Sequence, residues 1–472
     1  MNILELLKHE NKTALIQGDK RVTYTELLNN GLQFGGCLRN KGVKSGSFVL
    51  VFIPLSIELY IAMLGVWSIG ASAIFIDFSR GSKFVSESIE RLKPDIIVCD
   101  TVTGLVRMMH PKMRSIKVVN IKNHVKQKPV ENIEKVTPEH PAILTFTSGT
   151  TGFPKIAVRT HGFLINQYNV LKKHVDFNEN HIDLGTLPVF TLANLASNMT
   201  TLLPEKSYKS KINAKKLAIS MEKEGVTRAI CSPKLMSDLL KHSKFPRLKN
   251  IYLGGGPVYP SLLNKFSKDV DLQIVYGSTE AEPISGIRWS DVTEEDRIQI
   301  AHGQGLLVGF VVPEVEIRIG ENNEILVSGE TVLKGYLNGI GDNENKIRDE
   351  NEPNKIWHKT GDAGYLDSQG RLWLLGRVSQ AIFDENGTLY PFCVECILDA
   401  LYGIRGAILL YNKERIVVIE KGVVDCKVLL RNLKEQQITR VVEVKKIPMD
   451  KRHGAKIDYN QLNKNLSASF KL

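Results

Sequence analysis

A loop rich in hydroxyl groups and glycines lies near residue 150. Residues 142–146, AILTF, have the apolar character of a buried strand, and the chain continues as TSGTTGFPK. The loop consists of Thr147, Ser148, Gly149, Thr150, Thr151 and Gly152, and Lys155 follows it. Glycines let backbone N–H groups approach a ligand closely, hydroxyls donate hydrogen bonds, and a lysine neutralises negative charge. This combination favours binding of a polyphosphate, although the spacing is not that of the G-x-x-x-x-G-K-[ST] loop.

Two later strands also run into loops suited to a ligand. The first, NIYL, leads into Gly254, Gly255, Gly256 and Pro257. The second, LQIV, leads into Tyr276, Gly277, Ser278, Thr279 and Glu280. Doubly wound α/β folds bind their ligands beyond the carboxyl ends of the strands, so we expect both loops at a ligand-binding edge.

These loops resemble motifs of the superfamily that contains acyl-CoA synthetases, nonribosomal adenylation domains and luciferases. The segment TSGTTGFPK is similar to its phosphate loop, GGGP to its adenine-contact turn and YGSTE to its Y-G-x-T-E motif. Thr360-Gly361-Asp362 resembles the T-G-D motif, and Gly376-Arg377 resembles the G-R pair before the family's hinge. Lys456, in HGAKID, stands where the family keeps its C-terminal lysine. The motifs follow the family's order over essentially the whole chain.

The resemblance implies a role for each of these polar residues. Asp362 would accept hydrogen bonds from ribose hydroxyls, and Arg377 would donate to ribose or phosphate oxygens. Thr279 would donate to the α-phosphate, and Glu280 would supply an oxygen ligand to Mg²⁺. Lys456 would bridge the attacking carboxylate and the α-phosphate as pyrophosphate leaves. The implied catalytic residues are thus Thr279, Glu280 and Lys456, and the implied cofactors are ATP and Mg²⁺.

The implied reaction is ATP-dependent activation of a carboxylic acid, a fatty or β-hydroxy acid, as an acyl-AMP with release of pyrophosphate. Segments such as TLPVFTLANLASNM and PMDKRHGAKID are similar to the olefin β-lactone synthetase group, in which the substrate's own hydroxyl then closes a lactone. One alternative is an acyl-CoA or acyl-carrier-protein ligase, and another is a catalytically silent nucleotide- or acyl-binding protein. The acyl chain, its stereochemistry, the final acceptor, the oligomeric state and any carrier protein or pathway partner stay open.

The segment after Arg377 departs from that of thioester-forming relatives. It reads VSQAIFDENGTLYPF, with Ser379 at the predicted hinge and Asp384 and Glu385 in the following loop. Acidic side chains are unfavourable neighbours for an anionic coenzyme. The C-terminal segment also has GAK where those relatives have GK, so one extra residue precedes Lys456. Adenylation remains the prediction, and transfer to coenzyme A is left open.

Several other side chains carry weaker signals. Phe190, in LPVFTL, is a candidate for lining an apolar acyl tunnel, with ordinary core packing as the alternative. His161 and His453 follow the phosphate loop and precede Lys456, and we expect structural or surface roles for them. Cys393 and Cys396 form a CxxC without a second pair, which argues against a zinc site.

The periodicity of the chain predicts the elements that position these motifs. The first half alternates helical and strand patterns, which is typical of an α/β domain, and Thr23 with Glu26 forms a capping box before a helix. Short strands follow after about residue 300. We expect an α/β fold with a large two-sheet N-terminal adenylation domain that includes this β-rich section, residues 1–376. A small, mobile α+β lid domain, residues 377–472, would carry Lys456.

The composition is that of an ordinary soluble globular protein, with 472 residues, 43% of them hydrophobic and 24% charged. The net charge is +11, but the basic residues are scattered, so we expect a solvated surface and no nucleic-acid partner. The N-terminus does not resemble a signal peptide, and the most apolar region, residues 48–76, is interrupted too often to span a membrane. These features predict a cytoplasmic protein.

Overall fold

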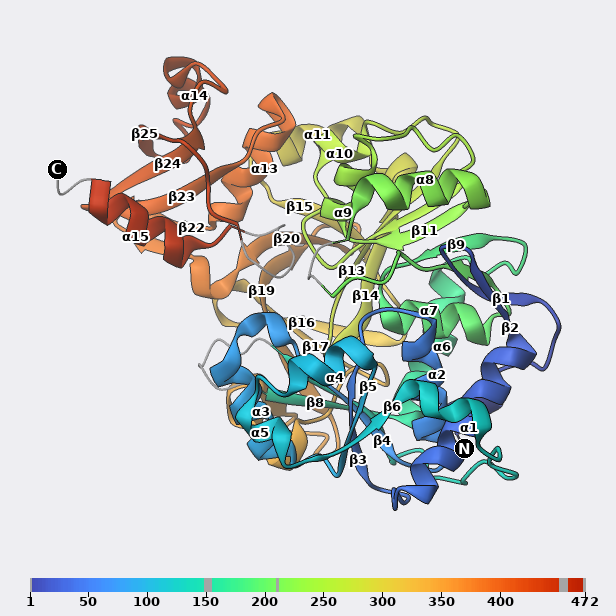
Figure 1. Cartoon of the computed structure of the whole chain (residues 1–472). Helices are drawn as coiled ribbons and strands as arrows, with labels where there is room; N and C mark the ends of the chain where they lie inside the picture. Colours follow the sequence, from blue (N-terminus) through green and yellow to red (C-terminus); the bar gives the residue numbers. More distant parts are fainter. Residues whose placement is uncertain (1, 148–154, 209–211, 450–456, 470–472) are drawn as a thin grey trace.

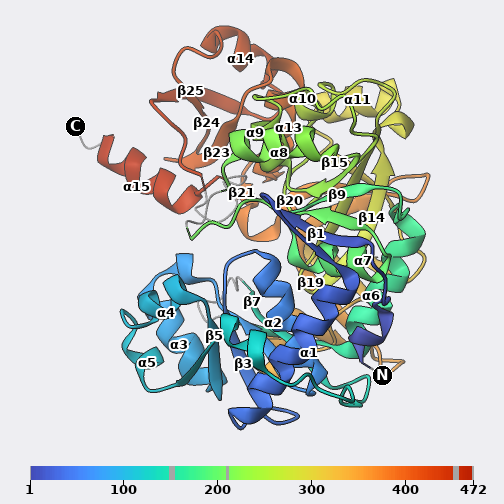
Figure 2. The ribbon, with the colours of Figure 1, turned by 45° about the vertical axis from the view of Figure 1, so that its right-hand side comes forward.

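The computed structural model describes residues 2–147, 155–208, 212–449 and 457–469. Two large sheets form most of the molecule, and a smaller unit from the end of the chain lies at one corner (Figures 1 and 2). The sheet-rich α/β architecture confirms the predicted fold class. None of the described helices combines the length and the apolar character that crossing a bilayer requires.

The first sheet has the strand order β6-β5-β3-β4-β7-β8. Strands β7 and β8 pair antiparallel, and the other neighbours pair parallel. The strands are β3 (Phe48–Phe52), β4 (Ser72–Phe75), β5 (Ile96–Cys99), β6 (Lys117–Asn120), β7 (Pro141–Thr147) and β8 (Lys155–Thr160). Thr147 and Lys155 are partners in the β7–β8 ladder, so the two ends of the predicted phosphate loop are held side by side.

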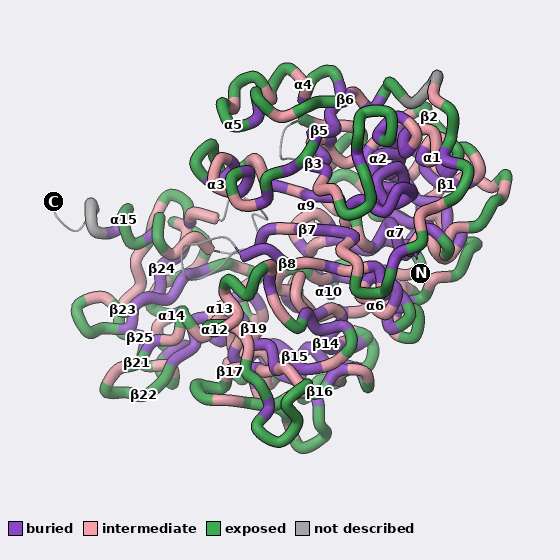
Figure 3. Tube along the Cα trace, turned by 90° about the horizontal axis from the view of Figure 1, so that it is seen from below, coloured by how far each residue is buried: buried purple, intermediate pink, exposed green. Residues whose placement is uncertain are grey.

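Helices cover this sheet as the sequence pattern predicts. They are α1 (Tyr24–Asn40), α2 (Ile57–Ser68), α3 (Ser82–Leu92), α4 (Thr101–Arg107) and α5 (Pro111–Arg114). The capping box at α1 is confirmed, since Glu26 N donates to Thr23 Oγ1 and Thr23 N donates to Glu26 Oε2. Helix α2 is apolar on all sides and buried, whereas α4 and α5 are largely exposed (Figure 3).

The second sheet has the order β16-β17-β19-β20-β15-β14-β13-β12-β11-β9-β10-β1-β2, with β18 paired to β19. From β9 to β13 its neighbours run parallel, and beyond β13 they run antiparallel. The β-rich section expected after residue 300 therefore extends this sheet. The strands are β1 (Thr13–Gln17), β2 (Lys20–Thr23), β9 (Ile182–Gly185), β10 (Thr200–Leu202), β11 (Arg228–Cys231), β12 (Asn250–Leu253), β13 (Asp271–Ser278), β14 (Ala281–Arg288), β15 (Leu306–Val311), β16 (Val315–Ile319), β17 (Glu324–Gly329), β18 (Lys346–Arg348), β19 (Ile356–Leu366) and β20 (Arg371–Arg377).

Helices between these strands pack against the second sheet. They are α6 (His161–His174), α7 (Pro188–Ala196), α8 (Ala214–Glu224), α9 (Pro233–Leu239), α10 (Pro260–Leu263), α11 (Glu294–Ala301) and α12 (Asp342–Asn345). Short 3₁₀ helices complete the elements: η1 (Ile3–Leu6), η2 (Phe78–Arg80), η3 (Ile121–Lys126), η4 (Trp289–Asp291), η5 (Glu321–Asn323), η6 (Leu337–Gly339) and η7 (Val378–Gln380).

The C-terminal unit has a sheet of its own, in the order β23-β24-β25. Its elements are β21 (Ile382–Asp384), β22 (Gly387–Leu389), α13 (Pro391–Tyr402), β23 (Gly406–Tyr411), β24 (Glu414–Glu420), α14 (Cys426–Asn432), β25 (Ile438–Val444) and α15 (Tyr459–Ser469). Glu395 on α13 accepts a hydrogen bond at 2.8 Å from Tyr459 on α15, within the unit. It also accepts one at 3.0 Å from Tyr259, the residue before α10, which ties the unit to the helices of the second sheet. The boundary at residue 376 and the motion of a lid stay predictions.

A buried polar cluster fixes α7 to the second sheet. Arg228 on β11 donates to Asp183 on β9 at 2.7 Å and to the side-chain oxygen of Asn194 on α7 at 3.1 Å. Asn194 in turn donates to Asp183 at 2.6 Å. The guanidinium also lies over the rings of Phe177 and Tyr252, at 4.6 and 5.2 Å from their centroids. Because these polar groups are fully buried, each depends on the others for its hydrogen bonds.

Replacing Arg228 with methionine should destabilise the protein, because it leaves the Asp183 carboxylate buried without its cation. Breaking one side of a buried ion pair typically costs about 3–5 kcal/mol. Urea unfolding followed by fluorescence should show a lower midpoint for Arg228→Met. Asp183→Leu in the same chain should recover part of the loss, and equal midpoints for wild type and Arg228→Met would show that the pair does not stabilise the fold.

Candidate active site

Three of the predicted site residues meet where the ends of β13 and β20 lie beside the middle of β19. The Tyr276 hydroxyl donates to Asp362 Oδ2 at 2.9 Å, and Arg377 Nη1 lies 3.2 Å from Asp362 Oδ1. Asp362 and Arg377 are opposite each other in the β19–β20 ladder, and Arg377 also donates to the Thr360 carbonyl at 3.1 Å. Burial and the Asp362 carboxylate both raise the pKa of Tyr276, so the phenol stays a donor. The ladder thus orients a carboxylate and a guanidinium together.

A second cluster surrounds the carboxylate of Glu280. The Tyr336 hydroxyl donates to Glu280 Oε1 at 3.2 Å, and Leu333 N donates to the Glu280 carbonyl at 2.7 Å. Burial disfavours the charge on this carboxyl, but the neighbouring His358 ring and hydrogen bonds from Thr147 and Tyr336 hold its pKa below the usual value. Glu280 is therefore ionised at neutral pH.

Lys155 joins this cluster from the first position of β8. Its side chain is buried, and its ammonium group lies 5.5 Å from the centre of the Tyr336 ring. Burial lowers the pKa of Lys155, while the charges of Glu280 and Glu344 oppose that change. The structure thus brings together Thr147, Lys155 and Glu280, which come from two separate motifs.

Lys346 and His358 complete the cluster, and no sequence motif identified them. They are partners in the β18–β19 ladder. Burial lowers the pKa of Lys346 to about 8, and burial with the nearby Lys346 charge lowers the pKa of His358 to about 4. The signal for His358 in the sequence was its position two residues before the T-G-D motif, on the same strand, β19.

Arg159 is a further residue that no motif identified. Its guanidinium is buried and donates from Nη2 to the carbonyl of Thr279 at 3.0 Å. Glu282 lies beside it, and burial raises the pKa of this carboxyl to about 7 against the charge of Arg159. Within the turn, Glu280 N donates to Ser278 Oγ at 3.2 Å, so Ser278 shapes the turn. These contacts fix the backbone of residues 278–282.

The loop from Gly254 to Pro257 emerges at the same sheet edge as Tyr276, because β12 and β13 are parallel neighbours. At Gly254 a Cβ atom would lie 2.6 Å from the Val275 carbonyl oxygen, so a side chain there would push the loop off β13. The structure places this loop beside the turn that begins at Tyr276.

Some predicted residues lie outside the described part of the chain. They are Ser148, Gly149, Thr150, Thr151, Gly152, His453 and Lys456. Met449 and Ile457, which flank the segment that carries Lys456, form an antiparallel bridge.

The described side chains fit a magnesium ion in one respect. No group of three or more His, Cys, Asp or Glu side chains in the described ranges is arranged to hold a metal by itself. Mg²⁺ usually binds through one or two carboxylates together with the phosphates of its nucleotide. An ionised Glu280 carboxylate beside cationic side chains fits that mode of binding.

Asp384, one of the two acidic residues expected to disfavour coenzyme A, has a cationic partner. Arg415 binds its carboxylate through two hydrogen bonds of 2.8 and 2.7 Å. The guanidinium holds the pKa of Asp384 below its usual value and offsets its charge. Glu385 is exposed in the same loop. Glu385 is thus the exposed member of the acidic pair that was expected to disfavour coenzyme A.

Three weaker candidates are structural. His161 is buried, accepts from Ile3 N at 3.2 Å, and has its pKa lowered to about 4 by burial. Phe190 packs in a buried cluster with Leu171 and Tyr252. Cys393 and Cys396 are buried free thiols on α13. Core packing, the alternative stated for Phe190, describes its surroundings.

Fold and site together define a nucleotide-binding α/β enzyme. Comparison with known families makes this specific: residues 5–337 match the AMP-binding enzyme family, and the chain belongs to that family. It is an adenylate-forming enzyme that activates an acid, as the motifs predicted. The predicted resemblance to the acyl-CoA synthetase, adenylation-domain and luciferase superfamily is thereby confirmed.

Curated relatives extend over most of the chain. An olefin β-lactone synthetase of Stenotrophomonas maltophilia is 24% identical over an alignment 502 residues long, which covers 94% of this chain and 91% of the relative. An olefin β-lactone synthetase of Xanthomonas campestris is 26% identical over 432 residues, covering 82% and 77%. A 2-succinylbenzoate–CoA ligase of Bacillus licheniformis is 27% identical over 404 residues, covering 82% and 81%.

Solved structures support the fold. The O-succinylbenzoate coenzyme A synthetase of Bacillus subtilis in complex with AMP matches with a TM-score of 0.80 at 22% identity, covering 98% of this chain and 96% of that one. An anthranilate CoA ligase in complex with anthranoyl-AMP matches with a TM-score of 0.84 at 16% identity, covering 100% and 98%.

Asp362→Asn should weaken AMP and ATP binding by the same factor, because both nucleotides carry the ribose that Asp362 is predicted to bind. Losing a hydrogen bond to a charged group corresponds to about 10-fold or more in affinity. Calorimetric titration with each nucleotide measures both constants, with the exposed Asp269→Asn as the control. Unchanged AMP affinity would contradict the ribose assignment.

Proposed function

We propose that this enzyme activates a fatty or β-hydroxy acid as its acyl-AMP and then closes a β-lactone within the same active site. The observation that carries the proposal is the similarity to an olefin β-lactone synthetase over 94% of the chain. The motif segments that distinguish this group in the sequence agree with it. The similarity to a CoA ligase favours transfer to coenzyme A as the second candidate.

In the first step the substrate carboxylate attacks the α-phosphorus of ATP, and the bond to the β,γ-pyrophosphate breaks. Two anions must approach each other, so cationic side chains are the main contribution that the protein makes. Lys155 would contact the phosphates, and Lys456 would reach the α-phosphate when the C-terminal unit closes. Mg²⁺ held by Glu280 would neutralise phosphate charge.

In the second step the β-hydroxyl oxygen attacks the acyl carbon, and the hydroxyl proton is lost. The bond from the acyl carbon to the AMP oxygen breaks, and AMP leaves with that electron pair. The product is a four-membered lactone, one water lighter than the starting acid. No second substrate is needed for this step.

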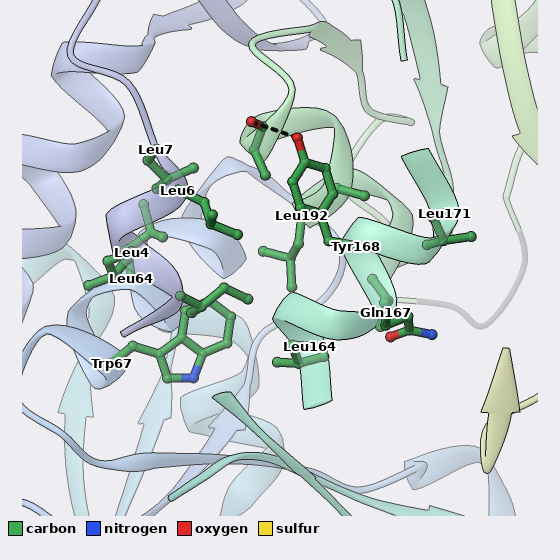
Figure 4. Close-up of a pocket in the computed structure, with 14 residues that line it drawn as sticks. Leu4, Leu6, Leu7, Leu64, Trp67, Leu164, Gln167, Tyr168, Leu171 and Leu192 are labelled. Atoms are coloured by element: carbon green, nitrogen blue, oxygen red, sulfur yellow. Dashed lines mark hydrogen bonds between the residues drawn. The ribbon is translucent and has the colours of Figure 1, made fainter. Parts of the chain in front are cut away.

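The lining of one small cavity is suited to a substrate with an alkyl chain. The cavity lies between η1, α2, α6 and α7 and has a volume of about 30 Å³, so an acyl chain would have to widen it (Figure 4). The residues that line it are almost all apolar: Ile3, Leu4, Leu6, Leu7, Leu64, Trp67, Leu164, Gln167, Tyr168, Leu171, Val189, Leu192, Ala193 and Ala196.

A single side chain, Gln167, connects this cavity to the segment that follows the YGSTE turn. Gln167, on its α6 wall, donates from Nε2 to the carbonyl of Glu282 at 3.3 Å. Glu282 lies two residues after Glu280 in the chain. Tyr168 on the next position donates to the carbonyl of Ala196 at 3.1 Å, which fixes α6 against α7 (Figure 4). An acyl chain could therefore extend from the turn between these two helices.

Mass spectrometry of the product tests the proposal most directly. A 3-hydroxy fatty acid with Mg-ATP should give a product lighter by one water without coenzyme A, because the attacking hydroxyl is in the substrate. A thioester that forms only with coenzyme A would instead assign the protein to the CoA ligases. Lys456→Ala is the negative control, and it should form neither acyl-AMP nor lactone; full activity in this variant would contradict the assigned role.

The cavity predicts how acyl length is selected. Ala193→Leu should shift the preference toward shorter acids, because the added carbons fill space between α6 and α7, and Leu192→Ala should shift it toward longer acids. Pyrophosphate release with 3-hydroxy acids of increasing length measures both profiles. The KM for ATP serves as the internal control, and identical length profiles in all three proteins would show that the chain binds elsewhere.

A further inference from the structure

Two lysines from distant parts of the chain meet at one aromatic ring. Lys155 Nζ lies 5.5 Å and Lys346 Nζ lies 5.3 Å from the centre of the Tyr336 ring. Lys346 also donates to the carbonyl of Leu333, which holds its ammonium group on this side of β18. The cluster thus contains a second cation, and no motif in the chain accounts for it.

Both lysines depend on the same carboxylate. The charge of Glu280 favours the ionised form of each, while burial disfavours it. The two ammonium groups also disfavour each other's charge, and Lys155 contributes to the lowered pKa of Lys346. Glu344 also favours the charge of Lys155, and Asp342 that of Lys346. The phosphates of the nucleotide are the anion that this enzyme class brings to the site, and two ammonium groups at one aromatic ring are close enough together to bind them jointly.

One short segment positions both cations. At Gly341, where φ is +98°, an added Cβ would lie 2.8 Å from Lys155 Cδ and 2.9 Å from its Cγ, so the lysine stem packs directly on this glycine. Asp342 Oδ1 then accepts from Tyr336 N at 2.8 Å, which fixes the segment to the aromatic residue. Lys346 follows four residues later. The segment 341–346 therefore forms a wall against which Lys155 rests and from which Lys346 projects.

We propose that Lys346 is a second phosphate-binding residue, which contacts the β- or γ-phosphate of ATP and the departing pyrophosphate together with Lys155. The proposal rests on the assignment of Glu280 and Lys155 to the phosphate side of the site. Lys346 binds the part of ATP that AMP lacks. Its removal therefore distinguishes ATP from AMP, which a purely structural residue would not do.

The test compares three ligands in the full-length protein without any acid. Lys346→Met should weaken binding of ATP and of magnesium pyrophosphate by about 10-fold or more and leave AMP binding within about twofold. Lys346→Arg, which keeps the charge, should restore most of the ATP affinity. The matched control is Lys334→Met, because Lys334 is exposed on the segment that leads to Tyr336. Calorimetric titration measures all of these constants.

The outcomes separate this proposal from the proposed function. Equal losses of AMP and ATP affinity would show that Lys346 supports the fold of the site, and unchanged affinity for all three ligands would show that it does not reach the phosphates. Either result overturns the proposal. Because no acid is present, a failure to detect a β-lactone in the product assay leaves this comparison unaffected.

Discussion

The carboxylate of Glu280 is the group on which the arrangement of buried charges depends. A half-buried anion is stable only when hydrogen bonds and cations surround it. Here four separate parts of the chain supply them: the ends of β7 and β8, the loop at Tyr336, and the β18–β19 hairpin. The requirement to satisfy one carboxylate thereby draws the first sheet and the second sheet together at one point.

Two clusters with different polar groups lie near the antiparallel part of the second sheet. Asp362 and Arg377, opposite each other on β19 and β20, present an acceptor and a fork of donors. Lys155, Lys346 and Glu280 present cations and one hard anion. The turn that starts at Tyr276 and ends at Glu280 connects the two clusters. On the proposed assignments, a nucleotide would lie with its sugar at the first cluster and its phosphates at the second.

Contiguous signals predicted the fold class and the family correctly, and they named several residues that the structure brings together. In motifs such as YGSTE and TGD the functional residues are consecutive in the sequence, so Tyr276 and Asp362 could be identified before their contact was known. Lys346, His358, Tyr336 and Arg159 were not identified, because their role arises only when strands from different regions become neighbours. The ion pair of Asp384 was not foreseen for the same reason: its partner Arg415 lies on β24, and sequence spacing gives no indication of that contact.

On helix α7, the side chain that anchors the helix differs from the side chains that line the cavity. Asn194 anchors it to Asp183 and Arg228, and the residues that face the cavity, among them Leu192 and Ala193, make no polar contact in that cluster. Substitutions that face the cavity can therefore leave this polar anchor in place. On the proposed assignment of the cavity to the acyl chain, α7 would be an evolvable part of the enzyme: a lineage, or a laboratory selection, would exchange one acid for another while Asn194 keeps its partners.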